Sequence, residues 1–142
     1  MWINAQDSQR QHSAIDAILR QAGIIPTQQR MDIALVMLTR PQHLSADQVF
    51  ELVNRAGKSV SKATVYNTLS LFSRTGVVRE VRLDPNRVFY DSNTADHYHL
   101  YNEDTGVLTD VSTECVRRED LPPLPEGTTL AGIDVIIRIR NV

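Results

Sequence analysis

Residues 45–83 read SADQVFELVNRAGKSVSKATVYNTLSLFSRTGVVREVRL. The stretch opens on Ser45 with Gln48 three residues later, a spacing that is typical of a capping box at the start of a helix. Ser61 is placed to cap a second helix, and Gly76 is placed to end it. Beyond that glycine the apolar residues recur at every second position, so the chain changes from helix to strand. Two helices joined by a short turn and followed by a strand predict a helix-turn-helix with a wing.

The flanking residues extend this pattern in both directions. Upstream, apolar residues at helical spacing over 14–22 and a capping residue at Thr27 predict two further helices. Downstream, the turn residues 84–86 lead into a second alternating run at 87–90. We therefore expect a winged helix-turn-helix domain over residues 1–91.

The rest of the chain is expected to form a smaller domain. Residues 92–96 are small and polar, and they are the best linker candidate. Alternating runs at 97–101 and 107–111 predict a β-hairpin, and a last strand is expected over 133–139. A sheet as small as the one expected in 97–142 rarely stabilises itself, and pairing with a second copy of the chain would supply the missing contacts. The sequence thus predicts an α+β protein, with an N-terminal winged helix-turn-helix domain followed by a small α/β dimerisation domain.

Composition limits the class of protein. The chain has 142 residues, of which 42% are hydrophobic and 23% charged, and these values exclude collagen and low-complexity disorder. No apolar run approaches the roughly 20 residues of a membrane span, and residues 1–7 lack the order of a signal peptide. The single cysteine, Cys115, allows neither an internal disulfide nor a thiolate zinc cluster. We expect a cytoplasmic protein without a membrane partner.

Charge is distributed unevenly along the chain. Residues 1–84 hold ten Lys or Arg against seven Asp or Glu, whereas residues 85–142 hold five against ten. A basic first part is typical of contact with a polyanion, and an acidic second part is compatible with cation binding.

The helix that follows Ser61 has one face suited to DNA. On a helical wheel, Val65, Leu69 and Phe72 share the face that we expect to be buried. The opposite arc offers phenol, amide, hydroxyl and guanidinium groups, which read bases and bind phosphates. An ordinary solvated helix face has a similar composition, but the capped helix before it and the basic wing after it favour DNA. The predicted contact residues are Lys62, Ala63, Thr64, Tyr66, Asn67, Ser70, Arg74, Arg79, Arg82 and Arg87.

Two histidines, His97 and His99, point to a metal site. Residues two apart on a strand share one face, so both imidazoles can reach one cation. Imidazole with carboxylate suits Zn²⁺, Fe²⁺, Mn²⁺ and related ions, and histidine also ligates haem iron. The competing interpretation is one hydrogen-bonded and one solvent-exposed histidine. The neighbouring oxygen donors are Asp91, Asp96, Glu103, Asp104 and Asp110, and Asp110 is expected on the paired strand.

Other classes of protein are less well supported. A metal-dependent hydrolase could use the histidine pair, but no motif for a nucleophile or a general base accompanies it. A winged-helix module that binds protein instead of DNA remains an alternative.

Three strings resemble a known family. PQHLSADQVF at 41–50, ATVYNTL at 63–69 and GVV at 76–78 look like the DNA-binding domain of the ferric uptake regulator family. The H-x-H strand, the hairpin and the last strand resemble the dimerisation domain of that family, and the likeness runs from about residue 12 to 140. Residues 125–138 look most like the iron response regulator (Irr) branch.

The resemblance implies a homodimeric, iron-responsive transcription regulator, not an enzyme, that binds A/T-rich inverted-repeat operators in double-stranded DNA. The interdomain regulatory site of the family falls on His43, His97, His99 and Asp110. Irr-type proteins sense haem, so His97 and His99 are also the expected haem-binding residues. DNA affinity is then controlled by haem or a divalent metal, or alternatively by a direct response to Fe²⁺, Mn²⁺ or Zn²⁺ without haem.

Several positions depart from the family pattern. Asn102 and Thr105 stand where the family has paired cysteines, so the cysteine-ligated structural zinc is expected to be missing. Tyr90 stands where the family has a glutamate ligand, which leaves open whether Tyr90 or a nearby acid completes the metal site. Asn67 stands where an arginine often follows the recognition-helix tyrosine, so a different operator preference is expected.

Overall fold

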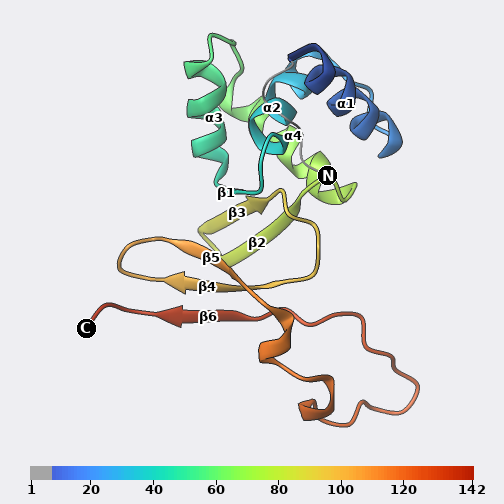
Figure 1. Ribbon diagram of the computed structural model, residues 1–142, viewed down its shortest axis with the longest axis vertical. Helices are drawn as coiled ribbons and strands as arrows, with labels where there is room; N and C mark the ends of the chain where they lie inside the picture. The colour runs from blue at the N-terminus through green and yellow to red at the C-terminus, as the bar shows by residue number, and fades with distance from the viewer. Residues whose placement is uncertain (1–7) are drawn as a thin grey trace. The chain divides into compact units, whose positions relative to one another are not determined.

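A computed structural model describes residues 8–142 of the chain (Figure 1). The first seven residues, which we compared with the pattern of a signal peptide, lie outside the described residues. The chain divides into two compact units, and the boundary falls between Thr94 and Ala95. The first unit combines helices with a small sheet, and the second contains another small sheet. The architecture is therefore α+β, as predicted.

Four α-helices lie in residues 8–94, and the starts of three of them follow the predicted capping signals. The side chains of Thr27, Ser45 and Ser61 each accept a hydrogen bond from the backbone N–H three residues further along. Such a cap stabilises a helix by about 1 kcal/mol. Gly23 and Gly76 follow two of the helices with φ of 80° and 79°, a conformation that residues with a side chain rarely adopt. The helices are α1 (Ser8–Gln21), α2 (Gln28–Leu38), α3 (Ala46–Arg55) and α4 (Lys62–Arg74).

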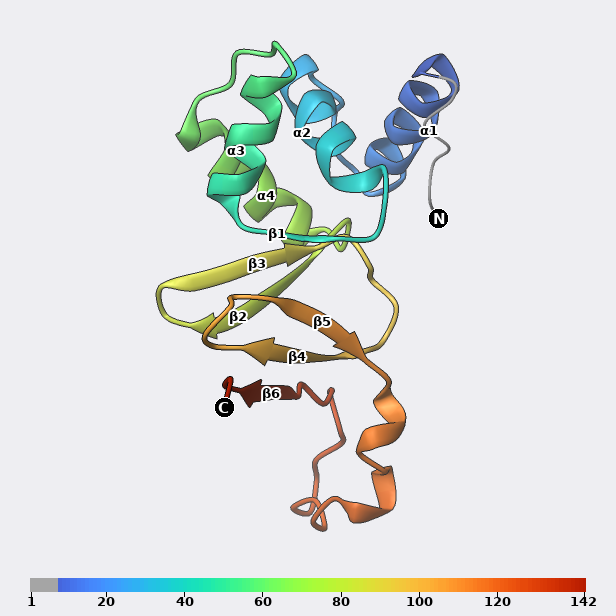
Figure 2. The same ribbon diagram turned by 60° about the vertical axis from the view of Figure 1, so that its left-hand side comes forward.

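The four helices enclose an apolar core. Leu19 of α1 and Met37 of α2 are completely buried in it, and burial of a side chain of this size contributes about 1.5–3 kcal/mol. The face of α4 that the helical wheel assigned to the interior is also confirmed, because Val65, Leu69 and Phe72 are completely buried. Figure 2 shows α3 and α4 packed together next to the sheet that follows them. The opposite face of α4 is thereby left outside the core.

A three-stranded antiparallel sheet completes the first unit. Its strands are β1 (His43–Leu44), β2 (Arg79–Asp84) and β3 (Arg87–Asp91), in the order β1-β3-β2. Strands β2 and β3 form the predicted wing hairpin. Strand β1 was not predicted, because two residues are too few to show an alternating pattern.

Ser92 lies at the point where we expected a linker to begin. Its hydroxyl donates to the backbone oxygen of Arg40 at 3.0 Å and accepts from the backbone N–H of Gln42 at 3.1 Å. The backbone N–H of Ser92 also donates to the carbonyl oxygen of Gln42. These bonds fix Ser92 to the segment that precedes β1, within the first unit.

The second unit is built on three strands. They are β4 (Tyr98–Asn102), β5 (Leu108–Val111) and β6 (Ile136–Ile139), in the order β5-β4-β6. Strands β4 and β5 form the predicted hairpin, whereas β6 pairs with β4 in parallel. The long connection from β5 to β6 holds two 3₁₀ turns, Thr113–Cys115 and Arg118–Asp120.

Polar side chains close the turn after β4. Asn102 accepts hydrogen bonds through Oδ1 from the backbone N–H groups of Asp104 and Thr105, at 2.9 and 3.1 Å. Asn102 Nδ2 donates to Asn141 Oδ1 at 2.9 Å, and the backbone N–H of Asn141 donates to Asp104 Oδ2 at 2.8 Å. Hydrogen bonds therefore hold this turn to the segment after β6, at the positions where the resemblance places cysteines.

Within residues 8–142, no helix combines the length and the apolar character needed to cross a membrane.

Candidate functional site

The outer face of α4 presents most of the residues predicted to contact DNA. Tyr66 is 48% exposed, so its ring and hydroxyl are open to contact from outside the domain. Thr64 is half-buried, and its hydroxyl accepts a hydrogen bond from that of Ser61, so it takes part in the helix cap. The remaining predicted residues combine amide, hydroxyl and cationic groups that can reach the edges of bases. The exposed residues are Lys62, Ala63, Tyr66, Asn67, Ser70 and Arg74.

Lys62 at the start of α4 already has partners on α3. Its ammonium lies 3.5 Å from Asp47 Oδ1 and 5.7 Å from the centre of the Phe50 ring. The ion pair is exposed, and exposed ion pairs contribute about 0–1 kcal/mol. A DNA phosphate can therefore replace Asp47 as the partner of Lys62 at little cost.

The wing carries three exposed arginines, Arg79, Arg82 and Arg87. Arg82 forms an ion pair with Glu80 on its own strand. Arg87 Nε lies 3.8 Å from Asp84 Oδ2 across the turn of the hairpin. Three exposed guanidinium groups on one hairpin suit contact with phosphates.

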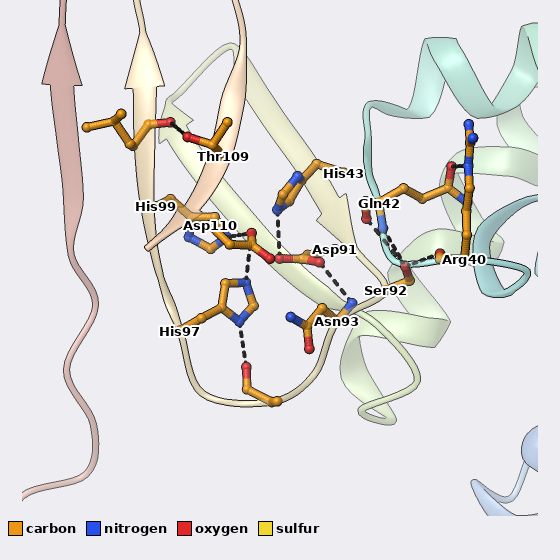
Figure 3. A network of polar contacts seen from close by, with 12 residues as sticks. Arg40, Gln42, His43, Asp91, Ser92, Asn93, His97, His99, Thr109 and Asp110 are labelled. Atoms are coloured by element: carbon orange, nitrogen blue, oxygen red, sulfur yellow. Dashed lines mark hydrogen bonds and ion pairs between the residues drawn. The ribbon is translucent and has the colours of Figure 1, made fainter. Parts of the chain in front are cut away.

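In the first unit, one histidine and one acid are paired in a way that suits one half of a metal site. His43 on β1 is the register partner of Asp91 on β3, and His43 Nε2 lies 3.1 Å from Asp91 Oδ2 (Figure 3). The Asp91 side chain is 1% exposed, and its other oxygen accepts a hydrogen bond from the backbone N–H of Asn93 at 2.9 Å. A buried carboxylate in this geometry can bind a metal ion together with the imidazole or orient the imidazole as a ligand.

In the second unit, His97 and His99 share one acidic partner. Asp110 lies on β5, the strand paired with β4, and is the register partner of His99. Asp110 Oδ1 lies 3.5 Å from His97 Nε2 and 3.9 Å from His99 Nε2. Two ligand atoms on one transition metal are at most about 4.2 Å apart, twice a metal–nitrogen bond length. Both nitrogen–oxygen distances lie below this limit, so Asp110 can share one divalent ion with either imidazole without rearrangement of the strands.

The tautomer of His97 also suits a metal ligand. Its Nδ1 lies within hydrogen-bonding distance of the backbone oxygen of Ala95 (Figure 3). A carbonyl oxygen only accepts, so Nδ1 carries a hydrogen, and in the neutral imidazole this leaves Nε2, 3.5 Å from Asp110 Oδ1, as the nitrogen with the lone pair. Metal-bound histidines commonly have this kind of support on the second nitrogen.

Tyr90, which the sequence left open as a ligand, belongs to the core of the first unit. It pairs in register with Leu44 and Glu80. Burial, with smaller contributions from Glu80 and Tyr66, raises the pKa of the Tyr90 hydroxyl above its ordinary value. A phenol that keeps its proton is a poor metal ligand, so the neighbouring Asp91 is the better candidate.

Sequence reasoning named Asp91 only as one of five nearby oxygen donors. The observation that singles it out is its pairing with His43, and this pairing depends on β1. A two-residue strand leaves no periodic signal in the sequence, so the pairing could not be foreseen.

Comparison with known proteins places the chain. The sequence pattern described as "Ferric uptake regulator family" matches residues 21–135. The chain belongs to the ferric uptake regulator family. Members of this family are transcription regulators, not enzymes.

Individual relatives agree with this assignment. The peroxide-responsive repressor PerR of Staphylococcus aureus strain Mu50 is 35% identical over 94 residues, which are 66% of this chain and 64% of that protein. The match thus spans slightly less than two thirds of the length of the relative. The ferric uptake regulator of Pseudomonas aeruginosa with manganese has 26% identity and a TM-score of 0.69, over 89% of this chain and 96% of that one. The regulator of Vibrio cholerae, at 21% identity and a TM-score of 0.73 over 89% and 98%, shares the fold.

Proposed function

We propose that this protein is a homodimeric transcription regulator whose affinity for DNA is set by one divalent metal ion per chain. The ion is held by His43 and Asp91 of the first unit together with His97, His99 and Asp110 of the second. The observation that carries the proposal is the presence of an incomplete imidazole–carboxylate set in each unit. Zinc, iron and manganese take four to six ligands, more than either half supplies alone.

The connection between the two halves favours a shared ion. Asp91 and His97 are six residues apart in the chain, and a segment of this length spans at most about 20 Å. Groups on so short a tether meet at a high effective concentration. A metal ion bound by the ligands of one unit can therefore readily bind the ligands of the other unit as well.

A shared ion gives a direct way to control DNA binding. Ligands from both units fix the angle between them, and in a dimer this angle sets the separation of the two α4 helices. That separation has to match the half-sites of the operator. The metal can shift the DNA affinity only by the difference between its affinity for the angle that matches the operator and its affinity for other angles. A chain without the bridging metal loses more conformational freedom when it binds DNA than a chain whose two units the metal already joins. We therefore expect the metal to raise the affinity for DNA.

The second unit supports a homodimer. Ile137 and Ile139 on the edge strand β6 each remain 39% exposed. A sheet with so small a core needs additional buried apolar surface for stability. A second copy of the same strand supplies this surface symmetrically.

The operator is expected to be an A/T-rich inverted repeat. A symmetric dimer requires a palindromic site. On α4, the Asn67 amide can pair with the edge of adenine, and the ring of Tyr66 can contact the methyl group of thymine.

Haem, which the resemblance to Irr suggested, is the weaker candidate ligand. The ring centres of His97 and His99 are 4.6 Å apart, and both imidazoles lie near the same carboxylate. A haem ligated by both histidines would lie between their rings. Each nitrogen would then be about 2 Å from the iron and each ring centre about 1 Å further out, so the ring centres would be about 6 Å apart. Haem could thus be held by only one of these histidines in this arrangement.

A response to peroxide is a second candidate function. The identity of 35% to a repressor named as peroxide-responsive favours it. Ferrous iron is oxidised by peroxide, whereas Zn²⁺ has no redox chemistry. Hydrogen peroxide should then weaken DNA binding by the Fe²⁺-loaded protein and leave the Zn²⁺-loaded protein unchanged.

The experiment that tests the proposal is a titration of the metal-free protein on a fluorescent duplex. The duplex is first selected from a random library with the Mn²⁺-loaded protein. Mn²⁺, anaerobic Fe²⁺, Zn²⁺ and haem are then added separately while anisotropy reports DNA binding. We expect a divalent ion to raise the affinity at least tenfold and haem to have no comparable effect. An affinity that depends on haem alone would replace the metal proposal with the Irr interpretation.

A further inference from the structure

A small groove between α2 and α4 extends beyond the residues assigned to DNA contact so far. Its volume is about 220 Å³, and the two helices that form it pack against each other in the first unit. No residue of α2 was predicted to contact a ligand. The groove is lined by Gln29 and Arg30 of α2 and by Thr64, Asn67, Thr68 and Leu71 of α4.

The chemistry of the lining suits an oxyanion. It offers a guanidinium, two amides and two hydroxyls with a single apolar side chain, and no carboxylate is among the lining residues. Guanidinium and amide groups donate hydrogen bonds to phosphate oxygens. The groove is smaller than the roughly 300–1,000 Å³ typical of pockets for small organic ligands. A phosphate group with its sugar matches this size better than a compact metabolite does.

Arg30 is held in place before any ligand arrives. Its Nη1 donates to the backbone oxygen of Ile25 at 2.9 Å, in the segment that leads into α2. A guanidinium has five N–H donors, so this bond leaves donors for a second acceptor. The side chain has thus lost part of its freedom already, and less entropy is lost when it binds an anion.

The backbone charge of α2 acts in the same direction. The groove includes residues of the first turn of α2, where the helix carries partial positive charge. No acidic residue occupies that turn to compensate for it. Gln29 is exposed at this end of the helix and lines the groove together with Arg30.

Asn67 connects the groove to the face of α4 that we assign to DNA. It is exposed, it lines the groove, and it is one of the proposed base contacts. We propose that the groove seats a phosphate of the DNA backbone, with Gln29 and Arg30 as contacts outside α4. This inference rests on the proposed function, because it extends the DNA interface from one helix to two.

Substitutions of opposite charge at Gln29 give a sharp test. Gln29→Glu places an anion in the groove, yet it should stabilise α2, because an acid in the first turn complements the helix dipole. Gln29→Lys places a cation in the groove, and it should destabilise α2 because a cation in the first turn opposes the helix dipole. With the Mn²⁺-loaded protein, we expect Gln29→Glu to weaken DNA binding about three- to tenfold and Gln29→Lys to strengthen it, with a salt dependence steeper by about one phosphate contact.

Two duplexes separate this contact from base recognition. A phosphate contact carries no sequence information, so both variants should change the affinity equally for the selected inverted repeat and for a scrambled duplex. Arg30→Gln should reduce both affinities in parallel. Inorganic phosphate at millimolar concentration should have no effect on the wild-type complex, because the DNA phosphate is held by many other contacts. Release of the DNA by phosphate would instead identify a site for the free anion and overturn the proposal.

Leu124→Glu is the matched control. Leu124 is 48% exposed in the second unit, and the substitution changes the charge by the same amount as Gln29→Glu. If the two Gln29 variants bind both duplexes as Leu124→Glu does, the groove is not a phosphate seat. That result leaves the proposed function intact as long as the wild-type protein prefers the selected duplex. A wild-type protein that binds neither duplex would contradict the proposed function and this inference together.

Discussion

His99 on β4 and Asp110 on β5 lie directly opposite each other in the antiparallel sheet of the second unit, with Nε2 and Oδ1 3.9 Å apart. The same oxygen lies 3.5 Å from Nε2 of His97. One acid therefore serves two imidazoles. Because the carboxylate is fixed by strand register and not by a flexible loop, the second unit offers a metal a largely preformed half-shell of ligands.

Asp110→Asn tests the role of this acid. The substitution keeps the shape of the side chain but removes its charge, so the fold should survive while Mn²⁺ affinity falls at least tenfold. Isothermal titration of the metal-free protein measures the change. Asp134→Asn changes an exposed acid of the same unit and should leave the affinity unaltered. Equal affinities for both variants would remove Asp110 from the ligand set.

Asp91→Asn tests whether one ion uses ligands from both units. Asp91 lies in the first unit, so a shared ion predicts a stoichiometry of one metal per chain and a loss of affinity comparable to that of Asp110→Asn. Combining the two substitutions should cost less than the sum of the single effects, because both act on the same ion. Two independent binding steps, each sensitive to only one substitution, would show that the halves hold separate ions.

Removal of metal should leave the second unit folded. Hydrogen bonds of Asn102 hold its turn and tie it to Asn141 after β6, without any thiolate. A chelator should therefore leave the circular dichroism spectrum of the protein unchanged, including its β-sheet contribution. Asn102→Ala should lower stability by about 1 kcal/mol for each hydrogen bond lost, which a thermal melt detects. Asn141→Ala removes only the tie and should cost less. Unfolding on chelation would reveal a structural metal elsewhere.

Local signals in the sequence were sufficient to predict the helices. The capping box of Ser45 and Gln48 and the cap at Ser61 act within three residues, so they can be read without knowledge of the fold. The hairpin that brings Asp110 to the strand next to His97 and His99 is also a local feature, although the register that pairs Asp110 with His99 came from the structure. In both cases, the residues that interact are close in sequence.

The remaining features depend on contacts between distant parts of the chain. The pairing of His43 with Asp91 joins segments 48 residues apart through a strand of only two residues. The parallel pairing of β6 with β4 follows a long irregular connection, and the pattern of β6 alone does not choose its partner or direction. The groove between α2 and α4 exists only after the helices have packed. None of these leaves a periodic signal in the sequence.

Tyr90→Phe should change the response to alkaline pH. The pKa of the Tyr90 hydroxyl is raised in the folded protein, mainly by burial and then by Glu80. A raised pKa means that the folded state favours the protonated phenol. This contribution is complete below the unfolded pKa of about 10 and is lost as pH rises from there towards the folded pKa. Denaturant melts between pH 8 and 11 should show a smaller loss of stability for Tyr90→Phe than for the wild type. If the stability of both proteins fell equally with pH, the pKa of Tyr90 would not be raised in the folded protein.

Tyr66 and Asn67 should determine which DNA sequence is preferred. Both side chains are exposed on α4, so their removal leaves the core unchanged. Replacing both with alanine should weaken binding to the selected inverted repeat at least tenfold, since a good base contact contributes about 1–3 kcal/mol. Binding to a scrambled duplex should change little, because phosphate contacts from Lys62 and the wing remain. Tyr66→Phe keeps the ring and serves as the control for its contact with the thymine methyl group. An equal loss on both duplexes would show that these residues contact the backbone, and the preference of the protein for its operator would then have to come from the shape of the DNA.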